Sequence, residues 1–340
     1  MTSIFYIFIA ITCAVLLKIC ESKRIFVDYK IEKHKRYVSK IENYSIGGLI
    51  FYIFCCVLFV NETYFDFNFF ISISIIFFIG LLSDVKILKN AVLRFFLQLF
   101  ILFYFILFSD FQIPLSRIEI LDIFLKNYLF NKFFTIFCLL ILINGNNFID
   151  GINTLLLLNN IIISLFLVYF FSDKIHQPEI IFSYIIIIFI LLSFNLGGKV
   201  ILGDSGSYAL GFFLAIYLIE FDKNNPYLSP FFVISLIWYP CFELLFSIIR
   251  RLIKRKKAYK PDTYHLHQIL YSYLYISINN VKLSHLLVSI LINGYCLLSL
   301  SINYIYGYET SVILTFLFIN IIVYLIVYKI LFKKVISDLR

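Results

Sequence analysis

Long apolar runs separated by short polar segments make up most of the chain. Runs of about 15–20 residues, several of them shorter, lie at 3–20, 47–60, 69–82, 91–108, 133–149, 155–171, 180–194, 207–219, 231–249, 286–305 and 312–331. An α-helix rises about 1.5 Å per residue, so ~20 residues cross the hydrocarbon core of a bilayer. The runs are apolar all round and lack the period-2 alternation of barrel strands. The pattern predicts an all-α, polytopic membrane bundle of about eleven transmembrane helices that forms one domain, 1–340.

Composition supports a lipid environment. The chain is 62% hydrophobic and contains 41 Phe and 25 Tyr, whereas an ordinary soluble domain is roughly 45–50% apolar. One water-soluble core cannot bury so many large apolar side chains, so the lipid bilayer is an expected partner. The net charge of +9 comes from basic residues in short segments between the runs. That placement is typical of cytoplasmic loops, and no nucleic-acid partner is expected.

Lys and Arg gather in alternate connections. Basic residues are frequent in 21–45, 83–90 and 250–285, whereas 61–67 and 306–311 contain none. Because cytoplasmic loops are enriched in Lys and Arg, this alternation places the N-terminus outside and the C-terminus in the cytoplasm. The first run is interpreted as an uncleaved span, since its positive charges follow it. The 250–285 segment is expected to be a basic cytoplasmic loop.

The connection 109–132 departs from this alternation. It carries Arg117, Lys126 and Lys132 but falls on the outer side. We expect a short surface helix or a hairpin there.

Four polar clusters fall on the predicted cytoplasmic side, at 80–86, 144–153, 195–207 and 265–268. Taken alone, each is a plausible helix cap, turn or solvated loop. A carboxylate inside the bilayer costs about 2.5–3.5 kcal/mol on insertion scales, and less toward the interface. Acids, amides and a histidine pair gathered on one face therefore suggest a shared site.

The residue types in these clusters suit phosphate chemistry. Carboxylate and phosphate oxygens are ligands for Mg²⁺. Glycines let the backbone approach an anion, and helix N-termini favour its charge. Arg250, Arg251 and the basic residues at 254–257 would attract anionic substrates or lipid headgroups. A soluble nucleotide and a membrane-embedded phosphate could meet there.

Over roughly 20–300, the order and spacing of these motifs resemble the polyprenyl-phosphate N-acetylhexosamine-1-phosphate transferases of glycosyltransferase family 4, relatives of the phospho-MurNAc-pentapeptide translocase. The matching positions are Gly47-Gly48, Gly80-Leu81-Leu82-Ser83-Asp84, Asn144, Asn147, Asp150, Gly151, Asn195, Gly203, Asp204, Gly206, Ser207, Pro240, Glu243, Arg250, Arg251, His265 and His267.

The resemblance implies transfer of a sugar 1-phosphate from a UDP-sugar to polyprenyl (undecaprenyl) phosphate, with release of UMP. It implies Mg²⁺, or alternatively Mn²⁺, as the cofactor. A site on the cytoplasmic face of the bacterial inner membrane is expected, and a homodimer by analogy only. The implied catalytic residues are Asp84, Asp150, Asp204, His265 and His267, and Asp204, then Asp84, are the metal ligands. The implied substrate contacts are Asn144, Asn147, Asn195, Lys199, Arg250 and Arg251.

The sequence departs from the family pattern at three places. Ser83 stands where many members have the first of two adjacent acids, and Asn153 stands where many have another Asp. A phosphate monoester has a second pKa near 6, so the acceptor is already a nucleophile at neutral pH without an acid at position 83. A covalent carboxyl intermediate there is excluded, although Asp84 could serve. Three residues compete for the basic position before the glycine pair, namely His34, Lys35 and Lys40.

The His-Leu-His-Gln version of the last motif resembles members that begin O-antigen, capsule or other surface glycans. The peptidoglycan enzyme usually has a run of three histidines, which is absent here. The substrate sugar is therefore expected to be an N-acetylhexosamine, deoxy or not.

Three other functions compete with this interpretation. A transporter or channel would need polar residues near mid-membrane, where Glu243 is the main one, and the sequence has no convincing internal repeat. A CDP-alcohol phosphotransferase would continue Asp150-Gly151 with a different pattern from Ile152-Asn153. A catalytically inactive family member acting as a scaffold is supported by Ser83 alone.

Overall fold

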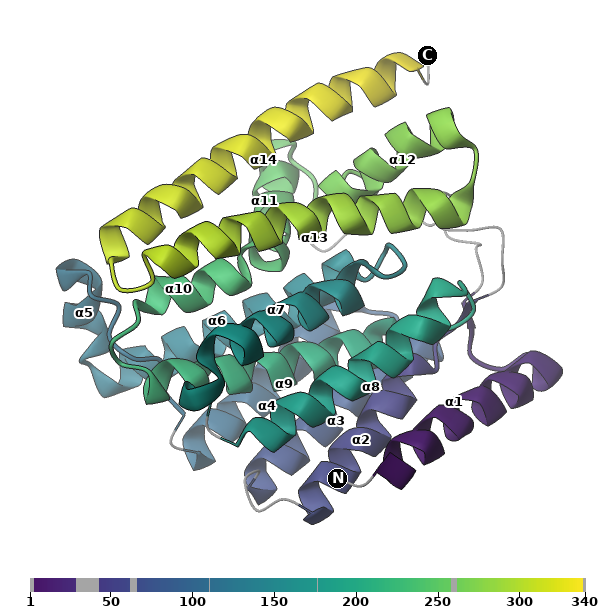
Figure 1. The fold of residues 1–340 in the computed structure, drawn as a ribbon, viewed down its shortest axis with the longest axis horizontal. Coiled ribbons are helices and arrows are strands. Elements are labelled where there is room, and N and C mark those ends of the chain that lie inside the picture. The colour runs from purple at the N-terminus through teal and green to yellow at the C-terminus, as the bar shows by residue number, and fades with distance from the viewer. Residues whose placement is uncertain are drawn as a thin grey trace.

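The computed structural model describes residues 3–28, 43–61, 66–109, 111–175, 177–257 and 262–338. The predicted all-helical class is confirmed (Figure 1), and the structure also contains one antiparallel pair of two-residue strands. In chain order the elements are α1 (Ser3–Lys23), β1 (Val27–Asp28), β2 (Asn43–Tyr44), α2 (Gly47–Asn61), α3 (Phe67–Asp84), α4 (Ala91–Phe108), α5 (Glu119–Leu125), α6 (Tyr128–Ile149), α7 (Leu155–Phe171), the 3-10 turn η2 (Ser172–Lys174), α8 (Pro178–Leu196), α9 (Gly203–Asn224), α10 (Pro230–Leu236), α11 (Trp238–Ile253), α12 (Leu266–Ile278), α13 (Val281–Ile305) and α14 (Thr310–Asp338).

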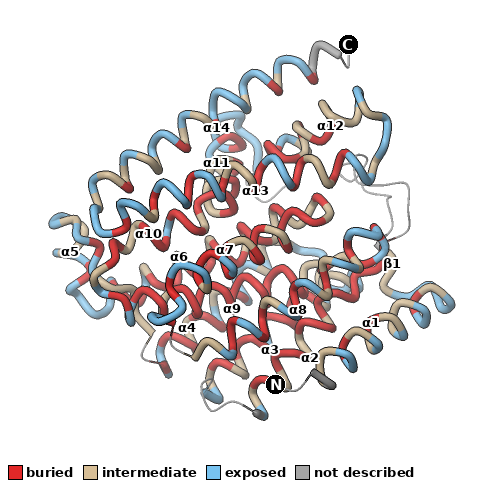
Figure 2. The backbone as a smooth tube through the Cα atoms, viewed as in Figure 1, coloured by how far each residue is buried: buried red, intermediate tan, exposed pale blue. Residues whose placement is uncertain are grey.

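Helix α9 lies at the centre of the N-terminal part of the bundle. It packs against α2, α3 and α6, and most of its residues are buried (Figure 2). Two glycines permit this close approach, because a Cβ at Gly80 would lie 2.4 Å from the Ser205 backbone and one at Gly48 would lie 2.5 Å from the backbone nitrogen of Gly206. Small residues at helix crossings allow such contacts in membranes. The end of α3 is thereby held against the start of α9.

Ten of the eleven apolar runs each lie on one helix, and the run 231–249 is divided between α10 and α11. Not every helix is long and apolar enough to cross a bilayer. Within the described residues, eight helices meet that standard, or nine if the bent pair α10–α11 is one span. Of the other two runs, α2 is a shorter apolar helix and α9 carries acidic residues at both ends. The chain is therefore a multi-pass membrane protein with eight to nine candidate spans in its described part.

The run 231–249 is not the continuous helix that the sequence predicted. Helices α10 and α11 meet at an angle of 78°, and the joining residue Ile237 has φ −112° and ψ 14°. Pro240 explains the break. A proline ring clashes with the carbonyl four residues earlier, here Leu236, where α10 ends. Pro240 lies within the run, but the prediction of a continuous helix took only the apolar pattern into account.

The segment 250–285 is also more ordered than the predicted loop. Residues 266–278 form α12, which begins directly after His265 and ends at Asn279 in a left-handed conformation, φ 52°. Apolar and aromatic residues of α12 are buried, among them Ile269 and Tyr271. The histidine pair is consequently held at the start of a packed helix.

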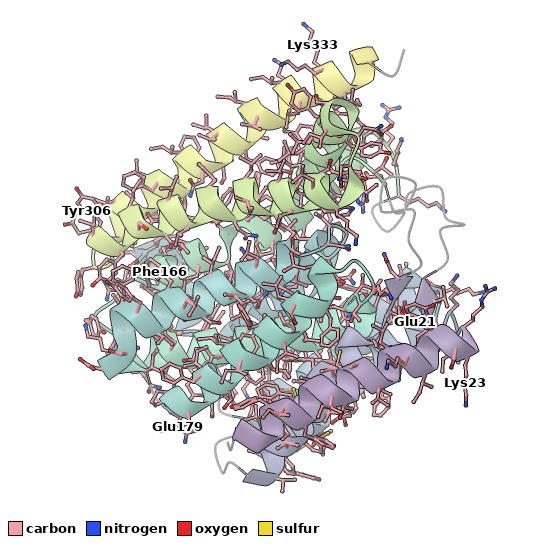
Figure 3. The ribbon with its side chains drawn as sticks, turned by 45° about the vertical axis from the view of Figure 1, so that its right-hand side comes forward. Glu21, Lys23, Phe166, Glu179, Tyr306 and Lys333 are labelled. Atoms are coloured by element: carbon pink, nitrogen blue, oxygen red, sulfur yellow. The ribbon has the colours of Figure 1, made fainter. Side chains whose placement is uncertain are left out.

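The short helix predicted within 109–132 is confirmed as α5. Nearby, Arg117 donates to the carbonyl oxygens of Pro226 (2.7 Å) and Tyr308 (3.1 Å). Lys132 lies over the Tyr128 ring, 4.5 Å from its centroid. Arg117 and Lys132, two of the three basic residues that departed from the alternation of basic loops, thus have partners within the protein. Figure 3 shows Tyr306 and Glu179 on the left of the molecule, opposite Glu21 and Lys23 at the end of α1.

Candidate active site

Asp84 ends α3 and caps the start of α9. Its Oδ1 accepts from the backbone N–H of Asp204 (2.8 Å), and its Oδ2 accepts from the backbone N–H (3.1 Å) and hydroxyl (2.6 Å) of Ser205. A carboxylate at a helix N-terminus satisfies unpaired N–H groups and favours the helix dipole. Gly203 makes room for it, since a Cβ there would lie 2.6 Å from Oδ2 and its φ is +72°. Asp84 thus holds α9 in place.

Asp204 lies one residue into α9 and faces three other elements. Its Oδ1 accepts from Asn147 Nδ2 of α6 (2.8 Å), and its Oδ2 accepts from the Ser83 hydroxyl of α3 (2.6 Å). The Arg94 guanidinium of α4 donates to both Asp204 Oδ2 and Ser83 Oγ. The Asp204 side chain is 27% exposed. We call Ser83, Asp84, Arg94, Asn147 and Asp204 the acidic cluster.

Sequence reasoning missed Arg94 as a site residue. It is the single charged residue in the apolar run 91–108. Charges within spans are rare and mark functional positions, so that isolation was an available signal. The arginine also shows what Ser83 does here. The hydroxyl accepts from Arg94 and donates to Asp204, which links the two charges where the family often has a further acid.

The C-terminal turn of α6 connects the acidic cluster to a second group of polar residues. Asn144 donates to Gln98 (2.9 Å), and Asn147 donates to Asp204 and to Ser207 Oγ (2.9 Å). One residue later, the Phe148 ring packs edge-on against His265, with centroids 5.0 Å apart. Asp150 follows as the C-terminal cap of α6.

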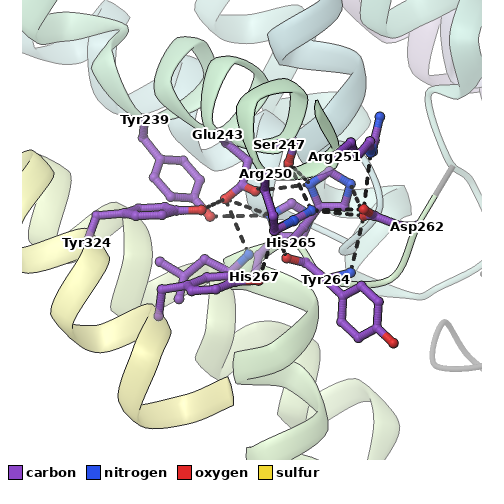
Figure 4. Close-up of polar contacts among 12 residues, drawn as sticks. Tyr239, Glu243, Ser247, Arg250, Arg251, Asp262, Tyr264, His265, His267 and Tyr324 are labelled. Carbon is purple, nitrogen blue, oxygen red and sulfur yellow. Dashed lines mark hydrogen bonds and ion pairs between the residues drawn. The ribbon is translucent and has the colours of Figure 1, made fainter. Parts of the chain in front are cut away.

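The second group surrounds a carboxylate with no exposed surface (Figure 4). Glu243 of α11 has its Oε1 3.0 Å from His265 Nδ1, while its Oε2 accepts from the Tyr324 hydroxyl (2.7 Å) and the Leu266 N–H (3.3 Å). Ser247 Oγ lies 3.1 Å from the same His265 nitrogen. A buried charge is tolerated only when donors surround it. We call Glu243, Asp262, His265, His267 and Tyr324 the histidine cluster.

Asp262 joins this cluster to the basic segment. Its carboxylate accepts from Arg250 (3.0 Å) and Arg251 (3.1 Å) and lies 3.5 Å from His265 Nε2. Burial alone would raise the pKa of Asp262, but the Arg251 hydrogen bond and the nearby positive charges lower it to about 2. Sequence reasoning missed Asp262, although it is the sole acid in 250–285.

His267 is fully buried beside the α6–α7 turn. Its Nδ1 lies 3.3 Å from the Tyr239 hydroxyl, and burial lowers the pKa of the ring to about 3, although Glu243 opposes this. The imidazole is therefore neutral at neutral pH. The Gln268 Oε1 beside it is buried without a hydrogen-bond partner. Both side chains border Gly151, where a Cβ would lie 3.5 Å from Gln268 Nε2 and 3.9 Å from His267 Nε2.

Two predicted contacts lie apart from both clusters. Lys199 pairs with Glu21 of α1 at 2.7 Å and is half exposed. Asn195 accepts from the Thr154 N–H and donates to the Val200 carbonyl (2.7 Å), so it braces the loops on either side. The alternatives for the basic position before the glycine pair, His34, Lys35 and Lys40, lie outside the described residues.

The donor set near Asp204 fits a magnesium ion completed by substrate. In the part of the chain that the structure describes, no three His, Cys, Asp or Glu side chains converge on one point. Mg²⁺ needs fewer, because it uses one or two carboxylates together with substrate phosphates and water. Asp204 is partly exposed, and its Oδ1 accepts one hydrogen bond with room for another. Both oxygens of Asp84 already accept bonds from α9, so Asp84 as a ligand stays a prediction.

Comparisons with known proteins agree with this arrangement. Residues 67–222 match the family model described as Glycosyl transferase family 4. The chain is 33% identical over 129 residues to an undecaprenyl-phosphate alpha-N-acetylglucosaminyl 1-phosphate transferase of Thermotoga maritima, covering 38% of this chain and 39% of that protein. It is 29% identical over 149 residues to the Salmonella typhi protein of that name, covering 42% and 41%.

A third relative is a decaprenyl-phosphate N-acetylglucosaminephosphotransferase of Mycobacterium leprae, 29% identical over 154 residues and covering 38% of each chain. The chain therefore matches about two fifths of the length of these relatives. The resemblance drawn from the motifs is confirmed as distant homology. The matched segment contains the whole acidic cluster, whereas the histidine cluster lies beyond it.

Proposed function

Since residues 67–222 match the model of Glycosyl transferase family 4, we propose that this chain transfers a sugar 1-phosphate from a UDP-sugar to polyprenyl phosphate. The sugar is an N-acetylhexosamine, UMP is released, and the product begins a lipid-linked surface glycan. The observation that carries this proposal is the contact of Asp204 with Asn147, one residue before Phe148, which packs on His265. Acidic and histidine clusters thus border one short turn.

The proposal includes the setting of the site. The 1–340 chain forms a single domain with eleven spans in a bacterial inner membrane, its N-terminus outside and its C-terminus in the cytoplasm. The acidic cluster lies where α3 and α6 end and where α4 and α9 begin, and the two histidines of the other cluster lie at the start of α12. The basic residues of 250–257 lie at the end of α11 and directly after it. This shared end of the bundle faces the cytoplasm, where a soluble UDP-sugar is available.

The reaction joins two phosphates. An oxygen of the acceptor phosphate attacks the phosphorus that bears the sugar, and the bond from that phosphorus to the UMP oxygen breaks, so that UMP leaves with the electron pair. Asp204 would hold Mg²⁺, which when bound would neutralise charge on the diphosphate. Arg94 adds a positive charge at the same place, and Asn147 orients the Asp204 carboxylate. Asp84 acts by holding the start of α9.

The α6–α7 turn and the histidine cluster bind the remainder of the donor. The Nε2 atoms of His267 and Gln268 border Gly151, and the Oε1 of Gln268 is buried without a hydrogen-bond partner. A sugar hydroxyl or an amide N–H of the donor would donate to this oxygen. Asn144 lies in the last two turns of α6 and Asp150 caps its C-terminus, and both are proposed to orient the donor. Arg250 and Arg251 hold positive charge near the acceptor phosphate.

An assay with the purified protein in detergent tests this proposal. Undecaprenyl phosphate, Mg²⁺ and a panel of radiolabelled UDP-sugars are supplied to the wild type and to Asp204→Asn. We expect lipid-linked product and released UMP from one or more N-acetylhexosamine donors, and a loss of at least about a hundred-fold in the variant. A folded wild-type protein that binds no donor and makes no product would rule the transfer out and favour an inactive or transport role.

A further inference from the structure

The C-terminal helix α14 contributes to the histidine cluster from the edge of the molecule. Only 17% of its most apolar 18-residue window is buried, which makes it a peripheral helix in Figure 1. Tyr324 is an exception, since it is 2% exposed. Its hydroxyl donates to Glu243 Oε2 at 2.7 Å, between residues 81 positions apart. This helix lies outside the segment 67–222 that matches the family.

The Tyr324 bond acts on a carboxylate that holds the histidine motif at two points. Glu243 Oε1 faces His265 Nδ1 at 3.0 Å, and Oε2 accepts from the Leu266 N–H at 3.3 Å. Its Oε2 is also 4.0 Å from His267 Nδ1. The carboxylate is fully buried, so it cannot replace a lost donor with bulk water. Removal of the Tyr324 hydroxyl should change how Glu243 divides its bonds between these groups.

A second tyrosine repeats the contact one turn later on the same face of α14. The Tyr328 hydroxyl accepts from Arg250 at 3.1 Å, and the two tyrosine rings are stacked with centroids 6.2 Å apart. Residues four apart share a helix face, so α14 meets both the Glu243 and the Arg250 sides of the cluster. Tyr324 and Tyr328 are the two tyrosines of α14, and both make these contacts.

We propose that Tyr324 is a positioning residue, which orients His265 and His267 through the Glu243 carboxylate. Helix α14 then supports the histidine side chains of the site in addition to facing lipid. The proposal rests on the proposed transferase function only for its effect on rate. The orientation of the histidine rings can be measured without any turnover.

The test compares Tyr324→Phe with Tyr295→Phe in the full-length protein. Tyr295 is the matched control. Its hydroxyl donates to Asn320 at 2.7 Å and ties α13 to α14, as the Tyr324 bond ties α14 to α11, but no bond of Tyr295 to Glu243 is present. The protein is labelled with ¹⁵N-histidine, and its five histidines are assigned with single His→Gln variants. We expect the His265 ring nitrogen signals to shift in Tyr324→Phe and to stay unchanged in Tyr295→Phe.

Turnover provides a second readout. In Tyr324→Phe, kcat should fall by roughly ten-fold or more while KM for the UDP-sugar changes little, because a misplaced catalytic group affects the reaction more than binding. Tyr295→Phe should retain wild-type kcat. Unchanged histidine signals in a folded Tyr324→Phe protein would overturn the proposal, whatever happens to the rate. Shifted signals without transfer by any protein would uphold the positioning role and refute the transferase function.

If Tyr324→Phe does not fold, incorporation of 3-fluorotyrosine at position 324 keeps the ring and the hydroxyl but makes the hydroxyl a stronger donor. A shift of the His265 signals there supports the proposal, and unchanged signals reject it.

Discussion

The acidic and histidine clusters lie on either side of the α6 C-terminal turn, but they differ in exposure. Asp204 is 27% exposed and meets one cation, Arg94. Glu243 and His267 have no exposed surface, and each makes its contacts with protein groups from α11, α12 or α14. A partly exposed carboxylate can exchange partners with little cost, whereas a buried one loses free energy with each lost donor. The first cluster is suited to bind a metal and phosphates, the second to hold a fixed geometry.

The difference also lies in how each cluster is assembled. The acidic cluster depends on the start of α9, which Asp84 caps. The histidine cluster depends on a buried network that continues to Arg250 and Arg251 through Asp262. Changes that affect stability should therefore act mostly through Asp84 in the first cluster and through protonation in the second.

Acidification should produce the largest change in stability, through the histidine cluster. His267 has a folded pKa of about 3, lowered from the usual 6.5. As the pH falls, the His267 imidazole is protonated in the unfolded chain before it is protonated in the folded protein. The folded protein is therefore most stable, as far as His267 is concerned, above about pH 6.5, and its stability falls as the pH drops from there toward 3. Asp262, with a pKa of about 2 against an ordinary 3.8, adds a loss in the same direction below about pH 4. We expect the free energy of unfolding to fall by up to about 1.4 kcal/mol per pH unit between 6.5 and 4.5.

The measurement is unfolding in mixed micelles between pH 7.5 and 4.5, with His267→Gln as the comparison. The variant starts from a lower stability, but its dependence on pH should be clearly shallower. Equal slopes in the two proteins would show that His267 is not held neutral and buried in the folded protein.

A smaller effect on stability is expected for Asp84→Asn. The substitution removes an acceptor from the donors at Asp204 and Ser205, and loss of a helix N-cap costs about 1–2 kcal/mol. Asp204→Asn should cost less than about 1 kcal/mol, since partly exposed ion pairs contribute little, although its catalysis is lost. Unfolding of both variants at pH 7.5 provides the measurement. A larger loss of stability in Asp204→Asn than in Asp84→Asn would reverse the roles assigned here.

The sequence was sufficient for those parts of the fold and site that depend on local pattern. The apolar runs are helical, with 231–249 divided between two helices, because lipid-exposed backbone must satisfy its own hydrogen bonds. Asp84, Asn147 and Asp204 converge as the motifs predicted, since each lies at a helix end on the same side. The apolar pattern did not determine the number of spans, because α2 is short and α9 carries acidic residues at both ends.

Features that depend on contacts between distant residues were missed. Tyr324 is one of 25 tyrosines, and nothing near it in the sequence indicates a bond to Glu243. The basic composition of 250–285 suggested a solvated loop, but burial of one face of α12 decided its structure. These contacts exist only once α11, α12 and α14 have packed.

The smallest effect is expected at Ser83, the position where the sequence departs most clearly from its family. Its hydroxyl donates to Asp204 and accepts from Arg94, but Arg94 also bonds Asp204 directly. Ser83→Ala should therefore leave the carboxylate paired and cost about 0.5–1 kcal/mol of stability, the net value of one hydrogen bond. Transfer should slow by no more than about five-fold, which corresponds to a loss of about 1 kcal/mol of transition-state stabilisation. Steady-state rates of the wild type and of Ser83→Ala, measured at saturating UDP-sugar, decide the point. A loss of a hundred-fold or more would mean that the Ser83 hydroxyl takes part in the reaction. The acidic cluster would then depend on fixed contacts, as the histidine cluster does, and the contrast between the two would not hold.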